Sequence, residues 1–247
     1  FHLILLIPLT SSLAAGSLRK SVLNVLIEIS NSSANNLAPA RKELSMIVGR
    51  DVNKLDQNEI LRAAAETASE NSVDGVFAPL FWMLVGCGLW NLNLSLPGPL
   101  ALVWTYKATS TLDSMLGYRR GKLRWIGTTS ARLDDVLTWI PCRLVLLTLP
   151  LVSVNLSRFL EVIKTSLREG SKDSSPNSGI SEAIFANCTG IKMGGTNWYK
   201  GEEVSKSILG GSYPLPSIKS VRKLLEINLR LEMTWLFISL LFVLIFI

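Results

Sequence analysis

The sequence predicts an all-α, polytopic integral membrane protein with about four to five membrane segments. Of its 247 residues, 48% are hydrophobic, and they are clumped into long runs instead of being spread along the chain. The polar stretches between these runs are rich in acidic, glycine and asparagine residues. We therefore expect helices in the membrane, and polar helices and loops that carry the functional site.

Composition excludes several classes of function. The net charge is +6, but the basic residues are spread over all polar stretches without an aromatic-interleaved patch, so we expect no nucleic-acid partner. The three cysteines lie far apart and the only histidine is His2, which argues against a disulfide framework and against cysteine or histidine metal sites. No Walker A or G-x-S-x-G string is present, so no motif predicts nucleotide or serine-hydrolase chemistry.

The first 40 residues combine an apolar start with a polar helix. Residues 1–15 are apolar but shorter than the roughly 20 residues of a spanning helix. We expect them to be the tail of a membrane helix whose beginning is missing from this sequence. Residues 16–40 read as a helix and then a loop rich in serine and asparagine, and Pro39 is expected to open the next helix.

Residues 49–82 are the stretch on which the predicted site is centred. Asp56 and Glu59 have the spacing of a capping box, so a helix is expected to begin near Gln57. If this helix continues to the end of the polar stretch, a stripe of charged side chains lies on one of its faces at successive steps of four. The stripe consists of Arg62, Glu66, Glu70 and Asp74.

The three acids of this stripe repel one another, by roughly a few tenths of a kcal/mol per pair. We therefore expect a cation against the stripe, either Mg²⁺ or an arginine from elsewhere in the chain. The alternative is a solvated helix face that holds only an Arg62–Glu66 pair. The apolar sequence that follows at once, from Gly75 to Trp82, favours the first interpretation, because it puts the stripe at the mouth of a membrane segment.

Three apolar regions follow the stripe. Residues 76–106 are expected to form a hairpin of two membrane helices with a Pro-Gly turn. Residues 136–156 form the next segment, and Arg143 within it is either a functional residue or a side chain that reaches the membrane surface. An amphipathic basic helix is expected to open at Ser217 and to continue as the last membrane segment.

The polar segments 41–75, 107–135 and 157–232 are expected to carry the site of one membrane-embedded domain, residues 1–247. If the hairpin crosses twice and 136–156 crosses once, the acidic stripe and the Ser-Pro-Asn-Ser-Gly loop lie on opposite sides of the membrane. For both to belong to one site, segment 136–156 must be re-entrant or interfacial, which its prolines permit, or the hairpin must be counted differently.

Besides the stripe, three further sets of polar strings border the apolar segments. Residues 172–179 and 190–201 are expected to be loops, whose backbone N–H groups and Asn or Ser side chains can hold an anion. The candidate residues are Asp113, Tyr118 and Arg119 in the first set, Arg132, Asp134 and Asp135 in the second, and Ser175, Asn177, Ser178, Gly179, Gly194, Gly195 and Asn197 in the two loops.

These strings follow one another in a fixed order over roughly residues 41–200: GRD, ENSVDGVFAPLFW, TLDSMLGYR, SARLDD, SPNSG followed by Glu182-Ala183, and GG-x-N-x-Y. In this order they resemble the CbiB/CobD family, the adenosylcobinamide-phosphate synthases of cobalamin biosynthesis. The resemblance implies a multi-pass enzyme of the cell (inner) membrane. It would join aminopropanol, free or as its phosphate, to a propionate carboxyl of adenosylcobyric acid in an ATP-dependent amidation.

The resemblance also implies roles for the candidate residues. ATP and Mg²⁺ are the expected cofactors, and the metal ligands expected first are Glu70, Asp74 and Asp134. Arginines and the two loops would hold phosphate or the rim of the corrin, the arginines being Arg50, Arg119 and Arg132. A carboxylate or Tyr118 would take the proton from the attacking amine, the carboxylates being Glu66, Glu70, Asp74, Asp113, Asp134 and Asp135.

The chain departs from the family pattern at four places. Asp173-Ser174 stands where the family has His-Pro, and Ile180-Ser181 where it has Trp-Pro. Thr196 replaces the proline of GGPN, and Ser110 replaces an asparagine before TLDSM. The N-terminal portion of the family, with its own polar motif, is also absent from this sequence.

Two other functions stay open on the sequence alone. One is a non-catalytic membrane scaffold for other late cobalamin-pathway enzymes, which are also possible partners of an active enzyme. The other is a small-solute transporter lined by Arg143 and the membrane-flanking acids. The membrane segments carry almost no acids, which disfavours the transporter. In all three cases the membrane lipid is an expected partner.

Overall fold

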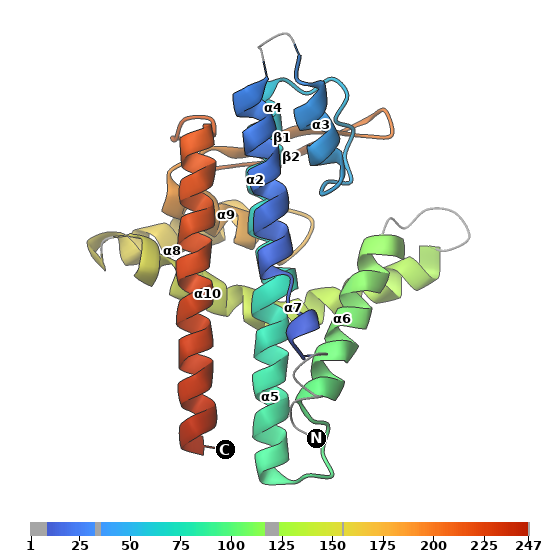
Figure 1. The fold of residues 1–247 in the computed structure, drawn as a ribbon, viewed down its shortest axis with the longest axis vertical. Coiled ribbons are helices and arrows are strands. Elements are labelled where there is room, and N and C mark those ends of the chain that lie inside the picture. Colours follow the sequence, from blue (N-terminus) through green and yellow to red (C-terminus); the bar gives the residue numbers. More distant parts are fainter. Residues whose placement is uncertain (1–8, 33–35, 117–123, 155, 247) are drawn as a thin grey trace. The chain divides into compact units, whose positions relative to one another are not determined.

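The protein is described by a computed structural model that covers residues 9–32, 36–116, 124–154 and 156–246. The described residues are mainly helical, as the sequence predicts, with one antiparallel pair of strands (Figure 1). The chain forms two compact units. One, here called the polar unit, comprises Ala15–Ser72 and Leu146–Leu231. The other, the apolar unit, comprises Val73–Val145, Glu232–Ile247 and the N-terminal residues up to Ala14.

The polar unit contains both strands and most of the shorter helices. Its elements are α2 (Ala15–Asn31), α3 (Ala38–Ser45), α4 (Gln57–Ser72), the 3₁₀ turn η3 (Leu156–Arg158), α8 (Phe159–Gly170), α9 (Ser178–Thr189), β1 (Met193–Tyr199) and β2 (Glu202–Leu209). The long helix α10 (Ile218–Phe246) begins in this unit and ends in the apolar unit. The predicted helix start at Pro39 and the predicted basic helix after Ser217 are both confirmed.

Helix α4 is the buried centre of the polar unit. It begins at Gln57 as predicted, because the backbone N–H groups of Asp56 and Glu59 each donate to the other residue's carboxylate at 2.8 Å. Helices α2, α3 and α9 and strand β1 all pack against it. Small side chains permit this close approach on several sides, and Ala63, Ala64, Ala65 and Ala68 are fully buried.

The prediction of a loop at residues 190–201 is wrong, because β1 and β2 form a hairpin there. Thr196 lies opposite Ser205 and Tyr199 opposite Glu202, and the register shifts between Met193 and Gly195. The glycines that read as loop positions supply the positive φ angles of this bulge, 78° at Gly194 and 96° at Gly195. The glycine-rich composition, which is typical of loops, belongs here to a strand with a bulge.

The apolar unit is built around the predicted helical hairpin. It contains a π-helical turn, η1 (Val73–Phe77), followed by α5 (Ala78–Leu92) and α6 (Pro99–Leu116), which pack together. The backbone of Gly98 and Pro99 lies directly against Gly86, where a Cβ atom would have no room. Helix α7 (Arg124–Ser153) follows and continues into the polar unit.

The turn η1 lies at the end of the predicted stripe. Helix α4 runs through η1 into α5 without a loop. Arg62, Glu66 and Glu70 keep their step of four within α4. Asp74 lies inside η1, and its place on the same stripe stays a prediction.

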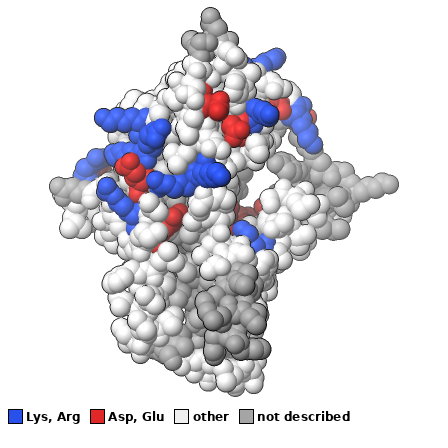
Figure 2. All heavy atoms as spheres, viewed as in Figure 1, with Lys and Arg blue, Asp and Glu red and all other residues white. Residues whose placement is uncertain are grey.

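Three helices among the described residues are long and apolar enough to cross a membrane: Gln57–Leu92, Gly127–Ser153 and Ile218–Ile245. The second helix of the hairpin, α6, does not meet that measure. On the face drawn in Figure 2, charged side chains gather on the polar unit. The end of α10 instead exposes large apolar side chains, including Phe237, Leu240 and Leu244. These features support a membrane protein.

We expect Gly194→Ala to destabilise the protein more than Gly201→Ala. Both glycines have similar φ angles, 78° and 80°, so each substitution carries a backbone penalty of about 1–2 kcal/mol. An added Cβ at 194 would also collide with the Ser207 carbonyl of β2, whereas nothing lies within 4 Å of one at 201. Thermal unfolding in detergent measures the difference, and equal shifts in Tm for the two variants would contradict this account of the bulge.

Candidate functional site

Glu66 is the centre of a buried network that joins α4 to β1 and to the segment before α4. Its side chain is 1% exposed. Oε2 pairs with Nη2 of Arg50 at 2.6 Å. Oε1 accepts a hydrogen bond from the Gly194 N–H at 2.8 Å and lies 3.3 Å from Nη1 of Arg62. One carboxylate therefore balances two guanidinium groups and binds the bulge of β1.

The two arginines extend this network along β1. Arg62 donates from Nη1 to the Gly194 carbonyl at 2.6 Å and from Nη2 to the Thr196 carbonyl at 2.8 Å. Arg50 donates from Nη1 to Oδ1 of Asn197 at 2.7 Å. Three candidate residues from distant strings, Arg50, Glu66 and Asn197, are thus brought into direct contact.

These contacts decide between the two interpretations of the acidic stripe. An arginine from elsewhere in the chain, Arg50, does lie against it. Burial alone would lower the pKa of Arg50, but the nearby carboxylate of Glu66 raises it above its ordinary value. The alternative of a solvated face is wrong, because Arg62 and Glu66 are both buried, although the Arg62–Glu66 pair that it included is present.

A second buried ion pair lies between α9 and β2. Nζ of Lys206 is 3.0 Å from Oε1 of Glu182, whose side chain is 1% exposed. Glu70 and Asp173 also act on Lys206 electrostatically. Burial, together with the charges of Glu66 and Glu70, raises the pKa of Glu182 to about 8 against the opposing charge of Lys206. The electrostatic interactions thus connect the two ion pairs.

Besides Oε2 of Glu66, which is ion-paired with Arg50, two buried polar atoms of this region have no hydrogen-bond partner among the described residues. They are Oε2 of Glu182, an acceptor, and Nδ2 of Asn197, a donor. An unsatisfied buried polar group costs about 1–3 kcal/mol, and in native proteins such groups commonly meet a ligand or an ordered water. We name the set Arg50, Arg62, Glu66, Glu70, Glu182, Asn197 and Lys206 the buried charge cluster.

The Ser-Pro-Asn-Ser-Gly loop has its amide groups engaged. The N–H of Ser175 donates to Oδ1 of Asp173 at 3.0 Å, and those of Asn177 and Ser178 donate to Oγ of Ser175 at 3.3 Å. This arrangement caps the start of α9. Gly179 is packed against the Gly170 backbone, with no room for a Cβ atom. Anion binding by this loop stays a prediction, and it would require these bonds to be exchanged.

The other candidate residues belong to the apolar unit or lie outside the described residues. Asp74 and Asp134 both act electrostatically on Tyr106, whose hydroxyl lies 3.2 Å from Oγ1 of Thr138. Arg132 is exposed on α7. The remaining candidates in this unit, Asp113 and Asp135, are partly exposed on α6 and α7. Tyr118 and Arg119 lie outside the described residues.

The magnesium ligands stay a prediction. Within the described ranges, no group of three or more His, Cys, Asp or Glu residues could hold a metal ion. Glu70 belongs to the polar unit, whereas Asp74 and Asp134 belong to the apolar unit. Mg²⁺ bound with substrate phosphates needs only one or two carboxylates, and Glu70 in the buried charge cluster meets that requirement.

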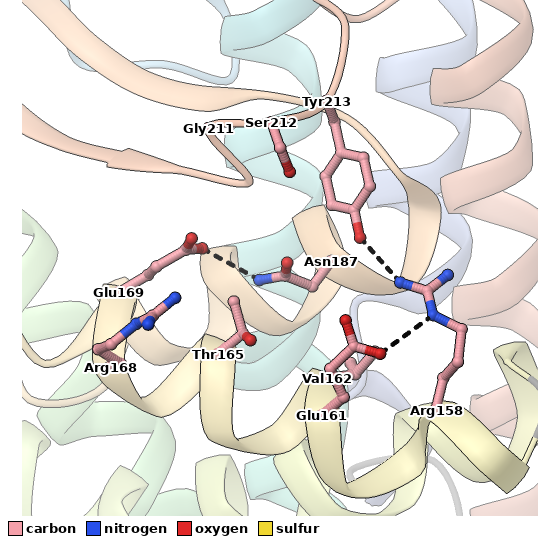
Figure 3. A pocket seen from close by; sticks show the side chains of 10 residues that line it. All are labelled: Arg158, Glu161, Val162, Thr165, Arg168, Glu169, Asn187, Gly211, Ser212 and Tyr213. Carbon is pink, nitrogen blue, oxygen red and sulfur yellow. Dashed lines mark hydrogen bonds and ion pairs between the residues drawn. The ribbon is translucent and has the colours of Figure 1, made fainter.

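A polar cavity of about 330 Å³ lies beside α8 (Figure 3). Arg158 reaches across one side, with its guanidinium 3.1 Å from the Tyr213 hydroxyl and 3.5 Å from Glu161. Glu169 accepts hydrogen bonds from Nδ2 of Asn187 at 3.1 Å and from the Gly210 N–H at 2.9 Å. We predicted none of these residues, because they lie outside the four polar strings.

Three members of the buried charge cluster, Arg62, Glu182 and Lys206, were not predicted as site residues, although Arg62 was placed on the stripe. Glu182 follows the Ser-Pro-Asn-Ser-Gly string in the family pattern, and that position could have identified it. Lys206 has no such signal, since it lies in a polar stretch with several exposed charges. Only the pairing of β2 with β1 brings it to α9.

Comparison with known proteins places these features in a family. A family model described as CobD/Cbib protein matches residues 1–228. The cobalamin biosynthesis protein CobD of Synechocystis sp. is 42% identical over 223 residues, which are 90% of this chain and 62% of that protein. CobD of Yersinia enterocolitica is 44% identical over 176 residues, 70% and 51% of the two chains. CbiB of Salmonella typhi is 40% identical over 195 residues, 78% and 57%.

The chain therefore spans between 51% and 62% of the length of these relatives. No solved structure matches it.

We expect Glu66→Gln to destabilise the protein by about 3–5 kcal/mol, because it leaves two buried guanidinium groups without their counter-charge. Glu161→Gln is the matched control. Glu161 also pairs with an arginine, Arg158, but its side chain is 65% exposed, so we expect an effect below about 1 kcal/mol. Denaturant unfolding in detergent gives both values. A loss at Glu66 as small as that at Glu161 would show that the network does not anchor β1 to α4.

Stability is expected to fall as pH rises from about 5 to about 8. The folded protein keeps the Glu182 proton up to a pKa of about 8, whereas the unfolded chain releases it near 4.5. Within this window the folded state binds more protons, so the free energy of unfolding decreases by up to about 1.4 kcal/mol per pH unit. Glu182→Gln removes the titration, and its stability should vary less with pH. A slope as steep as that of the unaltered protein would contradict the assignment.

Proposed function

This chain belongs to the CobD/CbiB protein family, and from that premise we propose that it catalyses an ATP-dependent amide-bond formation in cobalamin biosynthesis. The reaction joins aminopropanol or its phosphate to a propionate carboxyl of adenosylcobyric acid. The buried charge cluster carries the proposal, because it combines anion-binding donors, acids and two unsatisfied buried atoms. The relatives in Synechocystis and Salmonella are named as cobalamin biosynthesis proteins, which supports it.

An amide forms from a carboxylate only after activation. A propionate oxygen bonds to the γ-phosphorus of ATP and ADP leaves, which gives an acyl phosphate. The amine nitrogen then bonds to the acyl carbon, inorganic phosphate leaves, and the nitrogen gives up a proton. ATP supplies the phosphate that becomes the leaving group, and Mg²⁺ would neutralise the negative charge of the phosphates. The protein has to bind two anionic groups side by side and accept that proton.

The buried charge cluster has groups suited to each task. Arg50 is a cation that contacts Asn197, whose donor Nδ2 is unsatisfied. Lys206 is a second cation, on the strand that pairs with β1. Together these groups suit a phosphate or a propionate. Oε2 of Glu182 is an acceptor without a partner among the described residues, and a carboxyl with a pKa of about 8 exchanges protons with an amine near neutral pH. Glu70 is the acid in this cluster that would hold Mg²⁺.

A non-catalytic scaffold is the second candidate. It is favoured by the contacts of Arg62 and Glu66, which use their polar atoms on the protein itself. In a scaffold the cluster would serve stability alone. The two functions differ in what Asn197 does, since its Nδ2 atom makes no hydrogen bond among the described residues and so contributes little to the fold through that atom.

The test uses membranes that contain the full chain, supplied with adenosylcobyric acid, ATP, Mg²⁺ and either aminopropanol or its phosphate. We expect amide product with one of the two amines, detected by mass spectrometry, and loss of product with EDTA. Asn197→Ala should lower kcat/KM by about tenfold or more, since a lost hydrogen bond to a charged group is worth about 1.5–3 kcal/mol. Asn53→Ala, at an exposed position in the same unit, is the control.

Thermal unfolding of each variant separates lost chemistry from lost structure. If protein with a cooperative unfolding transition gives no product with either amine, the result would contradict the enzymatic proposal and favour the scaffold. Full activity of Asn197→Ala would leave the enzyme in place and remove the buried charge cluster as its site.

A further inference from the structure

We propose that α7 lies along the surface of the membrane, with both ends on one side, and binds phospholipid through its exposed face. Its length and composition alone would also permit a spanning helix. The choice between the two follows from contacts elsewhere in the chain and from the side chains that α7 exposes. It does not depend on the proposed catalytic function.

The polar unit joins chain segments from before α5 and after α7. Arg50 donates to Asn197 at 2.7 Å, and Glu66 accepts from Gly194 at 2.8 Å. Side chains in direct contact outside the apolar segments lie on the same side of a membrane. The number of crossings between α4 and β1 is therefore even.

The hairpin of α5 and α6 brings the chain back to the side on which α5 began. The two helices pack together and are joined by residues 93–98. Tyr106 in α6 lies within electrostatic range of Asp74, which precedes α5. Helix α6 has thus returned to the level at which α5 began. If α5 leads into the membrane and α6 leads back, α7 starts on the original side, and an even total leaves it no crossing of its own.

Contacts within the apolar unit place α7 at the mouth of this hairpin. Nε1 of Trp82, in the second turn of α5, donates to the Leu137 carbonyl at 3.1 Å. The Tyr106 hydroxyl lies 3.2 Å from Oγ1 of Thr138. Trp82 lies toward the end of α5 that is far from the turn, and Tyr106 lies near the middle of α6. Within this unit α7 runs across the direction of α5 instead of beside it (Figure 1).

Helix α7 has one exposed apolar face. Thr138, Cys142 and Val145 are buried, at 1% exposure or less. The opposite face exposes large side chains at helical spacing: Trp125, Leu133, Val136, Trp139 and Ile140. A face of this kind needs an apolar surface to cover it, and continuity with a membrane hairpin makes that surface the bilayer.

The charges on this face fit the headgroup region better than the hydrocarbon core. Arg132 is exposed on it. The Arg143 guanidinium lies 4.6 Å from the centre of the Trp139 ring and donates to the Trp139 carbonyl at 3.3 Å. Trp and Arg are typical of membrane interfaces, where the ring meets the acyl chains and the cation meets lipid phosphate. If α7 spanned the bilayer with Arg143 facing lipid halfway along it, burying this charge would carry a high free-energy cost.

Cysteine labelling tests the position of both ends. The native cysteines, Cys87, Cys142 and Cys188, are replaced by serine or alanine, and single cysteines are placed at the exposed positions Ser114 before α7 and Lys164 after it. A membrane-impermeant maleimide is added to sealed vesicles of each orientation. We expect Ser114→Cys and Lys164→Cys to react from the same face, and labelling from opposite faces would overturn the proposal.

A third cysteine checks the hairpin. Ser95→Cys lies in the exposed turn between α5 and α6 and should react only from the other face. Labelling of Ser95→Cys from the Ser114→Cys face would overturn the two crossings assigned to the hairpin, whereas the Ser114→Cys and Lys164→Cys pair decides the position of α7.

Spin labels at Val136 and Ile140 measure depth. Both positions should collide with oxygen in the lipid phase at a shallow depth, roughly 5–10 Å below the headgroups. An immersion depth that is much greater at 140 than at 136, toward the bilayer centre, would indicate a spanning helix and contradict the interfacial position. The labelled sites are all exposed, whereas the replaced residues Cys142 and Cys188 are buried. Thermal unfolding therefore checks that the cysteine-free protein and each variant keep the fold.

Discussion

The polar unit depends on a single buried carboxylate. Glu66 faces two guanidinium groups and a backbone amide of the β1 bulge, and its side chain is almost completely excluded from solvent. Two arginines could not be buried side by side without it, because an uncompensated charge in the interior is far more costly than the net gain from a pair. The position of β1 against α4, and with it the position of Asn197, follows from this one residue.

Stability and chemistry are separable in the buried charge cluster to an unusual degree. Arg62 and Glu66 use their polar atoms on the protein itself and fix the hairpin. Asn197 and Glu182 each use one polar atom in this way and leave the other buried without a partner among the described residues. The first pair builds the framework, while the second pair has capacity for a ligand. The cluster therefore contains two kinds of residue, those that hold the fold together and those that have a polar atom left for a ligand.

The sequence predicted those features that depend on neighbours along the chain. The capping box at Asp56, the hairpin of α5 and α6 and the basic start of α10 are local patterns, and each was confirmed. The β-hairpin was missed because its glycines serve a bulge and not a loop. The π-turn at Asp74 has no pattern of its own. Lys206 was missed because its partner, Glu182, is supplied by another element, and local periodicity says nothing about such pairs.

The hydrogen bonds from Arg62 to β1 have a consequence for the order in which the chain folds. A two-stranded sheet alone is marginally stable, so β1 and β2 need α4 before they can persist. Glu66 and Gly194 are separated by 128 residues, and the chain between them includes the whole α5–α6 hairpin and α7. During synthesis, α4 emerges long before its strands exist, with its charges still hydrated. The polar unit can close only after the intervening helices have been synthesised, so the site forms late in translation.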